Sequence, residues 1–344
     1  DLFVLVSNTA GGYSFYRDAR LRRLTRYRYN SSPLDMDGHH IYIKDGGTVW
    51  NPGWQPTKTP LDRYSCRHGL GYTILEGEKD GICAAQELFV PKGDACELDR
   101  LTLTNRSDRP RELDVFGYVE FCLWDAVDDS TNFQRNFSTG EVEVEPCAIY
   151  HKTEYRERRD HYAVFWSNTP VTSFDTARDA FCGVYGGPAD PQAVRAGHCS
   201  GSIAHGWAPV GALHIHVTLA PGEEKKILFG LGYIENPQEE KFIAPGVINK
   251  TRAHAMMARY ADDAQVDAAR AALADHWESL LSGYRLQSGE EKLDRMVNIW
   301  HQYQCMVTFN MSRSASYYER GTGRALGFRA RCQDLLGFVH IIPA

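Results

Sequence analysis

Residues 213–219 read LHIHVTL, with an apolar side chain at every second position. Residues 141–145 (EVEVE) and 101–104 (LTLT) alternate in the same way. A period of two is the pattern of a β-strand with one buried face. Turn sequences recur at strand-length intervals, and helix-length apolar periodicity is absent from the first 245 residues. We therefore predict that residues 1–245 form an antiparallel β-sandwich domain.

After residue 245 the period changes to that of helices. Apolar side chains are spaced three and four residues apart, and an Asp-Asp pair at 262–263 stands where a second helix could begin. Residues 246–288 are predicted to form a helical linker, and residues 289–344 begin a further helical domain. The spacing of a packed helix recurs there at Leu293, Met296, Val297, Trp300 and Val307. Pattern alone thus predicts β structure followed by α structure.

The composition argues against several classes of protein. A chain of 344 residues with a net charge of −6 and a pI near 6.1 has no large basic field for nucleic acid or an anionic membrane. No run approaches the roughly 18 apolar residues of a membrane span, and the first residues lack the pattern of a signal peptide. Nine cysteines without CxxC pairs favour reduced thiols over disulfides or a zinc site. We expect a cytoplasmic protein.

A segment near the end of the chain carries the strongest chemical signal. Residues 312–337 read SRSASYYERGTGRALGFRARCQDLLG and lie between two apolar stretches. The segment contains Arg313, Arg320, Arg324 and Arg329. Such a mixture is costly to bury, and guanidinium forks suit phosphate oxygens and vicinal sugar hydroxyls, so the segment indicates a polar binding pocket. Structural ion pairs with Glu319 and Asp334 are the alternative.

A second polar set lies in residues 124–136. It combines Trp124 and Asp125 with Gln134 and Arg135. Amide, carboxylate and guanidinium groups beside aromatic rings form the usual sugar-binding set, because hydroxyls need donors and acceptors while C–H faces pack on rings. A hydrogen-bonded turn between strands is the alternative, and the residues alone favour it.

The remaining polar residues give no recognisable catalytic or metal motif. His151 and His161 are ten residues apart with charged residues between them, which predicts a solvated, salt-bridged strand or loop and no metal site. There is no GxSxG elbow, P-loop or GxGxxG sequence, so a serine hydrolase, a nucleotidase or a dehydrogenase is not supported.

Longer motifs resemble a known family. They are NTAGGYSFYRDARLRRLTRYRYN (8–30), HGLGYT (68–73), FCLWDAVDDSTNFQRNFSTGEVEVE (121–145), IYHKTEYRERRDHYAVF (149–165) and MVNIWHQYQCMVTFN (296–310). With the arginine segment they closely resemble the cellobiose phosphorylases, which are inverting disaccharide phosphorylases. The resemblance covers nearly the whole chain. It implies an α+β multidomain fold, with an N-terminal antiparallel β-sandwich, a helical linker and the start of an (α/α)6 barrel, in a homodimer.

The resemblance also implies roles for single residues. Arg313 matches the arginine that helps to hold phosphate, and Arg324 matches one that grips the donor sugar. Arg329, Gln333 and Asp334 are assigned to substrate binding with it. Acceptor-sugar binding is assigned to Asp125, Gln134 and Arg135, and position 125 is often Asn in relatives.

One position departs from the family pattern. An aspartate that binds donor-sugar hydroxyls follows the arginine of the GFR motif in the family, whereas this chain has Ala330 followed by Arg331. Losing a carboxylate that accepts such hydrogen bonds costs about 1.5–3 kcal/mol of binding or transition-state stabilisation.

The reaction implied is phosphorolysis of cellobiose to α-glucose 1-phosphate and glucose, without a cofactor and with inorganic phosphate as co-substrate. One carboxylic acid protonates the glycosidic oxygen while phosphate attacks the anomeric carbon from the opposite face. In relatives that acid is an aspartate further downstream, so we assign no catalytic residue here and expect the chain to be an inactive fragment. The alternatives are a non-catalytic carbohydrate-binding or assembly module, and a phosphorylase for cellodextrin, chitobiose or β-1,2-glucan.

Overall fold

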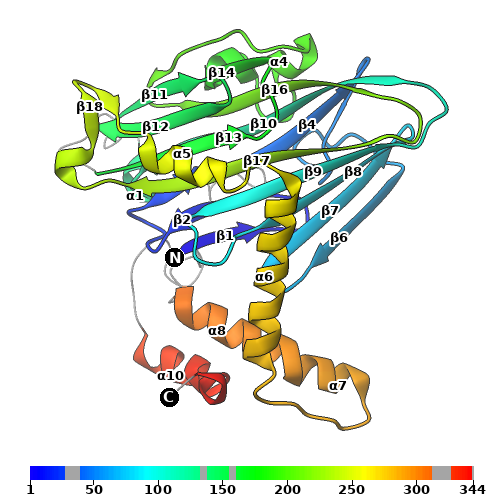
Figure 1. Ribbon diagram of the computed structural model, residues 1–344, viewed down its shortest axis with the longest axis vertical. Helices are drawn as coiled ribbons and strands as arrows, with labels where there is room; N and C mark the ends of the chain where they lie inside the picture. The colour runs from blue at the N-terminus through cyan, green and yellow to red at the C-terminus, as the bar shows by residue number, and fades with distance from the viewer. Residues whose placement is uncertain (28–38, 132–137, 155–159, 312–326, 343–344) are drawn as a thin grey trace.

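The computed structural model describes residues 1–27, 39–131, 138–154, 160–311 and 327–342. Two β-sheets stack on each other, and the long helix α6 connects them to a small group of helices (Figure 1). Strands occupy the first part of the chain and helices the last part. The predicted fold class, an antiparallel β-sandwich followed by helices, is confirmed.

Within the described residues one sheet has eight strands and the other has nine. The first has the order β1-β2-β3-β10-β16-β14, with β4 beside β10 and β5 beside β4. Its strands are β1 (Leu2–Val6), β2 (Gly12–Tyr16), β3 (Arg23–Thr25), β4 (His39–Asp45), β5 (Thr48–Trp50), β10 (Arg111–Trp124), β14 (Ser173–Ala177) and β16 (Pro209–Leu219). Neighbouring strands pair antiparallel throughout this sheet.

The second sheet has the order β15-β11-β12-β13-β17-β9-β8-β7-β6, also with antiparallel pairing. Its strands are β6 (Arg63–His68), β7 (Tyr72–Lys79), β8 (Ile82–Phe89), β9 (Cys96–Asn105), β11 (Thr139–Glu145), β12 (Ala148–Glu154), β13 (His161–Ser167), β15 (His205–Gly206) and β17 (Glu224–Glu235). A separate hairpin is formed by β18 (Phe242–Ala244) and β19 (Val247–Ile248).

The helices divide between the faces of the sandwich and the end of the chain. They are α1 (Ala126–Ser130), α3 (Arg178–Cys182), α4 (Gln192–Ala196), α5 (Thr251–Ala258), α6 (Asp263–Leu281), α7 (Glu291–Arg295), α8 (Gln302–Met311) and α10 (Phe328–Leu336). Shorter turns are η1 (Gln238–Glu240), η2 (Met296–His301, a π-helix) and η3 (Val339–Ile341). In the described part of the chain no helix is long and apolar enough to cross a membrane.

The main core lies between the two sheets. The alternating stretches at 101–104, 141–145 and 213–219 are confirmed as parts of β9, β11 and β16. Their inward side chains join one apolar cluster that both sheets share. Gly117 of β10 is required there, because a Cβ at this position would lie 2.6 Å from the ring of Phe229 in the opposite sheet.

Helix α6 packs on the outer face of the nine-stranded sheet. Asp262 caps its first turn by accepting a hydrogen bond from the Gln265 backbone N–H at 3.0 Å, as the Asp-Asp pair predicted. Val266 and Leu273 are buried against the sheet.

Ion pairs reinforce the packing of α6. Arg100 of β9 pairs with Glu87 of β8 at 2.7 Å and with Asp267 of α6, and Arg270 of α6 reaches Glu87 at 3.2 Å. Apolar burial and charge pairing together fix the helix to the sandwich.

The helix predicted around Trp300 is present, but its buried face differs from the prediction. Leu293 and Met296 are 47% and 55% exposed. The face that packs on the last helices carries Ile299, Met306 and Phe309 instead, together with the buried Gln302. The π-helical segment η2 rotates the following turns relative to α7, so the predicted stripe and the packed face do not coincide.

The prediction of a solvated segment at 151–161 is wrong at both of its ends, since His161 of β13 is buried as well. His151, Lys152 and Thr153 of β12 are buried. The His151 ring stacks on Phe121 with centroids 4.8 Å apart. Burial lowers the pKa of His151 to about 3, so the ring is neutral at physiological pH.

Four polar side chains are buried inside the sandwich at one end of its core. Glu97 accepts a hydrogen bond from the Ser14 hydroxyl at 2.5 Å, and Asp99 accepts one from the Gln86 amide at 2.8 Å. A cavity of about 10 Å³, large enough for one water molecule, lies beside both carboxyls. Burial raises the pKa of Asp99 well above its usual value. It also raises the pKa of Glu97.

We predict that Asp99→Asn stabilises the protein at alkaline pH. The folded protein keeps the Asp99 proton at pH values where the unfolded chain, with a pKa of about 3.9, has released it. Stability from this group is therefore complete below about pH 4 and is lost as pH rises through the folded-state pKa. Urea unfolding should show a higher midpoint for the variant at pH 8 and equal midpoints near pH 4. The exposed Asp190→Asn is the control, and a difference independent of pH would contradict the prediction.

Candidate functional site

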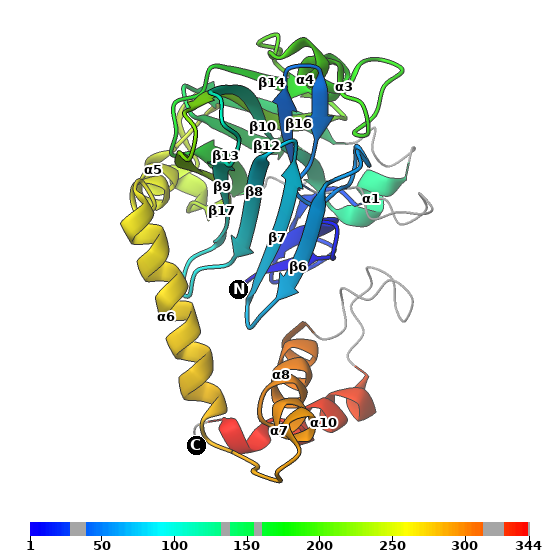
Figure 2. The ribbon, with the colours of Figure 1, turned by 90° about the vertical axis from the view of Figure 1, so that its right-hand side faces the viewer.

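A cleft of about 1050 Å³ lies between the sandwich and the final helices. Its sandwich side is formed by residues 1–6, with parts of β7 and β8. Its helical side carries Trp277, Trp300, Tyr303, Gln304, Asn310 and Asp334. Indole and phenol rings beside amides and a carboxylate are the combination that binds sugars, because rings pack on C–H faces while polar groups pair with hydroxyls. Figure 2 shows the N-terminal strand facing α8 across this region.

Helix α10 carries three of the predicted site residues, and they lie in two different environments. Asp334 lines the cleft. Arg329 and Gln333 are one helical turn apart on an exposed face. Arg331, which follows Ala330, places its guanidinium 4.8 Å from the centre of the Phe309 ring and thereby packs α10 on α8.

Asp125 is the predicted acceptor-site residue that the structure describes. It caps α1, and its Oδ1 accepts hydrogen bonds from the backbone N–H groups of Val127 at 2.9 Å and Asp128 at 3.1 Å. Its Oδ2 lies 3.7 Å from Nε of Arg20. The turn-forming role is therefore present, and a sugar-binding role for the same carboxylate stays a prediction.

Four predicted site residues lie outside the described residues. These are Gln134, Arg135, Arg313 and Arg324. In the sequence, Gln134 and Arg135 fall between α1 and β11, and Arg313 and Arg324 fall between α8 and α10. Their roles stay predictions.

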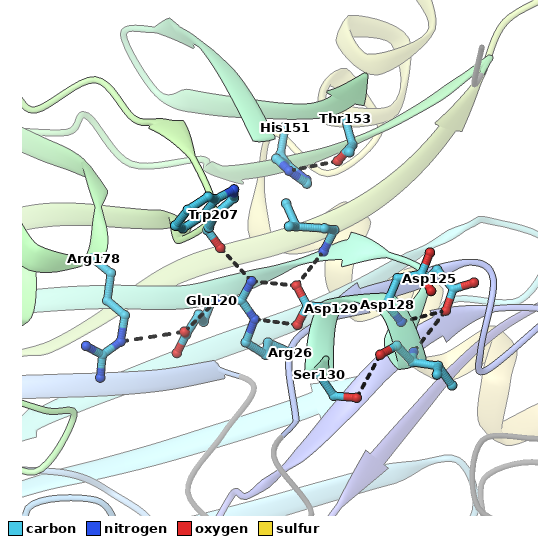
Figure 3. Close-up of polar contacts among 12 residues, drawn as sticks. Arg26, Glu120, Asp125, Asp128, Asp129, Ser130, His151, Thr153, Arg178 and Trp207 are labelled. Carbon is cyan, nitrogen blue, oxygen red and sulfur yellow. Dashed lines mark hydrogen bonds and ion pairs between the residues drawn. The ribbon is translucent and has the colours of Figure 1, made fainter. Parts of the chain in front are cut away.

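A buried ion network beneath α1 was not predicted from the sequence (Figure 3). Arg26 donates two hydrogen bonds to the Asp129 carboxylate at 2.5 and 2.6 Å, one to Glu120 at 3.0 Å and one to the Trp207 carbonyl at 2.8 Å. Burial by itself lowers the pKa of Arg26, but the two carboxylates outweigh it and raise the pKa above its ordinary value. The network anchors α1, and with it Asp125, to the end of β10.

The sequence signal for this network is weak. Arg26 lies within the motif at residues 8–30, and its partners Glu120 and Asp129 are 94 and 103 residues away in the sequence. In the described part of the chain, no three His, Cys, Asp or Glu side chains are grouped so that they could hold a metal ion.

We predict different outcomes for two changes at Asp125. Asp125→Ala should lower the free energy of unfolding by about 1 kcal/mol, because the cap is lost. Asp125→Asn should change it by less than about 0.5 kcal/mol, because Asn caps a helix equally well. Urea unfolding measures both. Equal losses in the two variants would show that the negative charge near Arg20, rather than the cap, is what stabilises this region.

Comparison with known proteins identifies the family. Residues 1–263 match the family model of the glycosyl hydrolase 94 supersandwich domain, and residues 276–344 match that of the glycosyl hydrolase 94 superfamily catalytic domain. The chain belongs to glycosyl hydrolase family 94. The described helices after α6 therefore lie in the part that matches the catalytic domain of family 94, and the sandwich is its supersandwich domain.

Two curated phosphorylases match nearly the whole length of the chain. It is 34% identical over 347 residues to the N,N'-diacetylchitobiose phosphorylase of Vibrio furnissii, a match that covers 99% of this chain and 41% of the relative. It is 31% identical to the solabiose phosphorylase of Paenibacillus borealis over 92% of this chain and 38% of the relative. The chain thus spans about two fifths of the length of these curated relatives. The resemblance to disaccharide phosphorylases seen in the sequence is confirmed at the level of the family.

A solved structure shares the fold. A bacterial glucoamylase complexed with acarbose superposes with a TM-score of 0.51 at 9% identity, over 90% of this family 94 chain and 40% of the glucoamylase. At such low identity this likeness shows the fold alone.

Proposed function

We propose that the protein containing this chain catalyses inverting phosphorolysis of a β-linked disaccharide, with N,N'-diacetylchitobiose as its preferred substrate and cellobiose as a poorer one. The observation that supports this most is the 34% identity to a chitobiose phosphorylase over 99% of the chain. A second chitobiose phosphorylase, from Vibrio proteolyticus, is also 34% identical. The sequence motifs alone suggested cellobiose, but the name of neither Vibrio relative includes that sugar.

The proposed chemistry needs one carboxylic acid and one phosphate. The acid protonates the glycosidic oxygen, phosphate forms the new bond at the anomeric carbon, and the released sugar leaves with the proton. Arginines neutralise the phosphate charge as the oxocarbenium-like transition state forms. We assign the neutralisation of the phosphate charge to Arg313. We assign the binding of the donor sugar to Arg324 and Arg329. Asp334, which lines the aromatic cleft, accepts hydrogen bonds from hydroxyl groups of the donor sugar.

The substrate choice can be measured directly. Purified protein is incubated with inorganic phosphate and either diacetylchitobiose, cellobiose or solabiose, and the sugar 1-phosphate formed is quantified. We expect the highest kcat/KM with diacetylchitobiose, no product without phosphate, and no product from the 344 residues alone. Sugar release that does not depend on phosphate would contradict the proposal. A higher kcat/KM with cellobiose would overturn the substrate assignment only.

Ala330 offers a gain-of-function test of the donor site. Ala330→Asp restores the carboxylate that the family resemblance places there, and the new hydrogen bonds should raise kcat/KM about tenfold to a hundredfold. Position 330 lies in the first turn of α10, where a negative charge favours the helix, so the change should not impair folding. Ala330→Asn supplies one acceptor oxygen and should give a smaller gain. An unchanged kcat/KM for both variants would contradict a donor-binding role at this position.

A further inference from the structure

The hairpin of β6 and β7 ends in the sequence Gly69-Leu70-Gly71, within the HGLGYT motif that the proposed chemistry does not use. Two hydrogen bonds brace its end. The Gly69 N–H donates to the Tyr72 carbonyl at 2.8 Å, and the His68 Nδ1 lies 2.9 Å from the Thr73 hydroxyl. We call residues 68–73 the hairpin tip. Figure 2 shows the tip extending below the sandwich toward α8.

The hairpin tip contacts both the linker helix and α8. The Gly71 N–H donates a hydrogen bond to the Tyr303 hydroxyl of α8 at 3.2 Å. Leu70 packs on the apolar cluster of Leu281, Phe338 and Ile341, which joins the end of α6 to the end of the chain. A single β-turn thus links the sandwich to the helices on the far side of the cleft.

The tip also fits closely against α6. Gly71 has φ +74°, and a Cβ there would lie 2.9 Å from Nε1 of Trp277. The Trp277 ring contacts Tyr303 edge-on with centroids 4.7 Å apart, and the Arg270 guanidinium lies 3.7 Å from the centre of the Tyr72 ring. No side chain larger than hydrogen fits at Gly71 without moving Trp277 or the turn.

Helix α8 contacts the sandwich at two points. Tyr303 meets the hairpin tip, and Met311 packs on the cluster of Tyr13 and Phe15. Tyr303 and Met311 are eight residues apart, which is about 12 Å along a helix. The stretch of α8 between them contributes Gln304 and Asn310 to the cleft wall.

We infer that the hairpin tip is a positioning element that sets the separation of α8 from the sandwich and thereby the width of the cleft. The effect of the hairpin tip on catalysis rests on the proposed function. Its effect on the docking of α8 does not. Gly71 and Leu70 act through the placement of α8.

The test is Gly71→Ala in the protein that contains this chain. The matched control is Gly46→Ala. Gly46 also has a positive φ, of +57°, but a Cβ there would point into open space with no atom within 4 Å, so the change carries the same backbone cost without a collision. The rescue variant is Gly71→Ala with Trp277→Phe, since phenylalanine removes the atom that the new methyl group meets. Hydrogen–deuterium exchange of residues 302–311 reports the docking of α8.

We expect Gly71→Ala to speed exchange in residues 302–311 at least fivefold, with β10 and β16 unchanged. Gly46→Ala should have no such effect, and the double variant should exchange more slowly than Gly71→Ala. The value of kcat/KM should fall at least tenfold in Gly71→Ala and be unchanged in Gly46→Ala.

Unchanged exchange in residues 302–311, or equal acceleration in β10 and β16, would overturn the inference. Should the unmodified protein lack phosphorylase activity, the proposed function would fail while the exchange data still decided the role of the tip.

Discussion

The position of the helices relative to the sandwich depends on how α6 is fastened to the nine-stranded sheet. Val266 and Leu273 bury its apolar side, and the Glu87 carboxylate is shared by Arg100 of the sheet and Arg270 of the helix. A helix held by both kinds of contact keeps a fixed position on the sheet, because moving it would expose apolar surface and separate partly buried charges. The cleft exists because α6 holds α8 at a distance from β1.

A buried ion network fixes the short helix α1 to the sandwich. Arg26 is surrounded by Asp129 and Glu120, so that each buried charge has an opposite neighbour. Removing one partner from such a set typically costs about 3–5 kcal/mol, because it leaves the other charge buried and uncompensated. The network thus ties the short helix α1, which is too short to be stable alone, to the long strand β10. Asp125 is thereby held at this flank of the sandwich.

Local sequence pattern predicts much of the fold. It predicts less of the candidate site. The alternation at 213–219 and the cap at Asp262 could be predicted because each depends on neighbours within a few residues. The burial of His151 could not be predicted, since it is decided by Phe121 in the opposite sheet, while adjacent charges in the sequence suggest solvent. Arg26 was missed for the same reason. Of the site residues, Asp334 lines a polar, aromatic cleft of the kind that its segment suggests, whereas the exposure of Arg329 depends on how α10 rotates when Arg331 packs on Phe309.

In the proposed reaction phosphate, rather than water, takes the sugar from its partner with inversion. Phosphorus and proton NMR of a reaction started with diacetylchitobiose and inorganic phosphate tests it directly. We expect the first product observed to be the α-anomer of the N-acetylglucosamine 1-phosphate ester, formed in equal amount with free N-acetylglucosamine. A β-anomeric ester, or two free sugars with no phosphorus signal beyond inorganic phosphate, would contradict it.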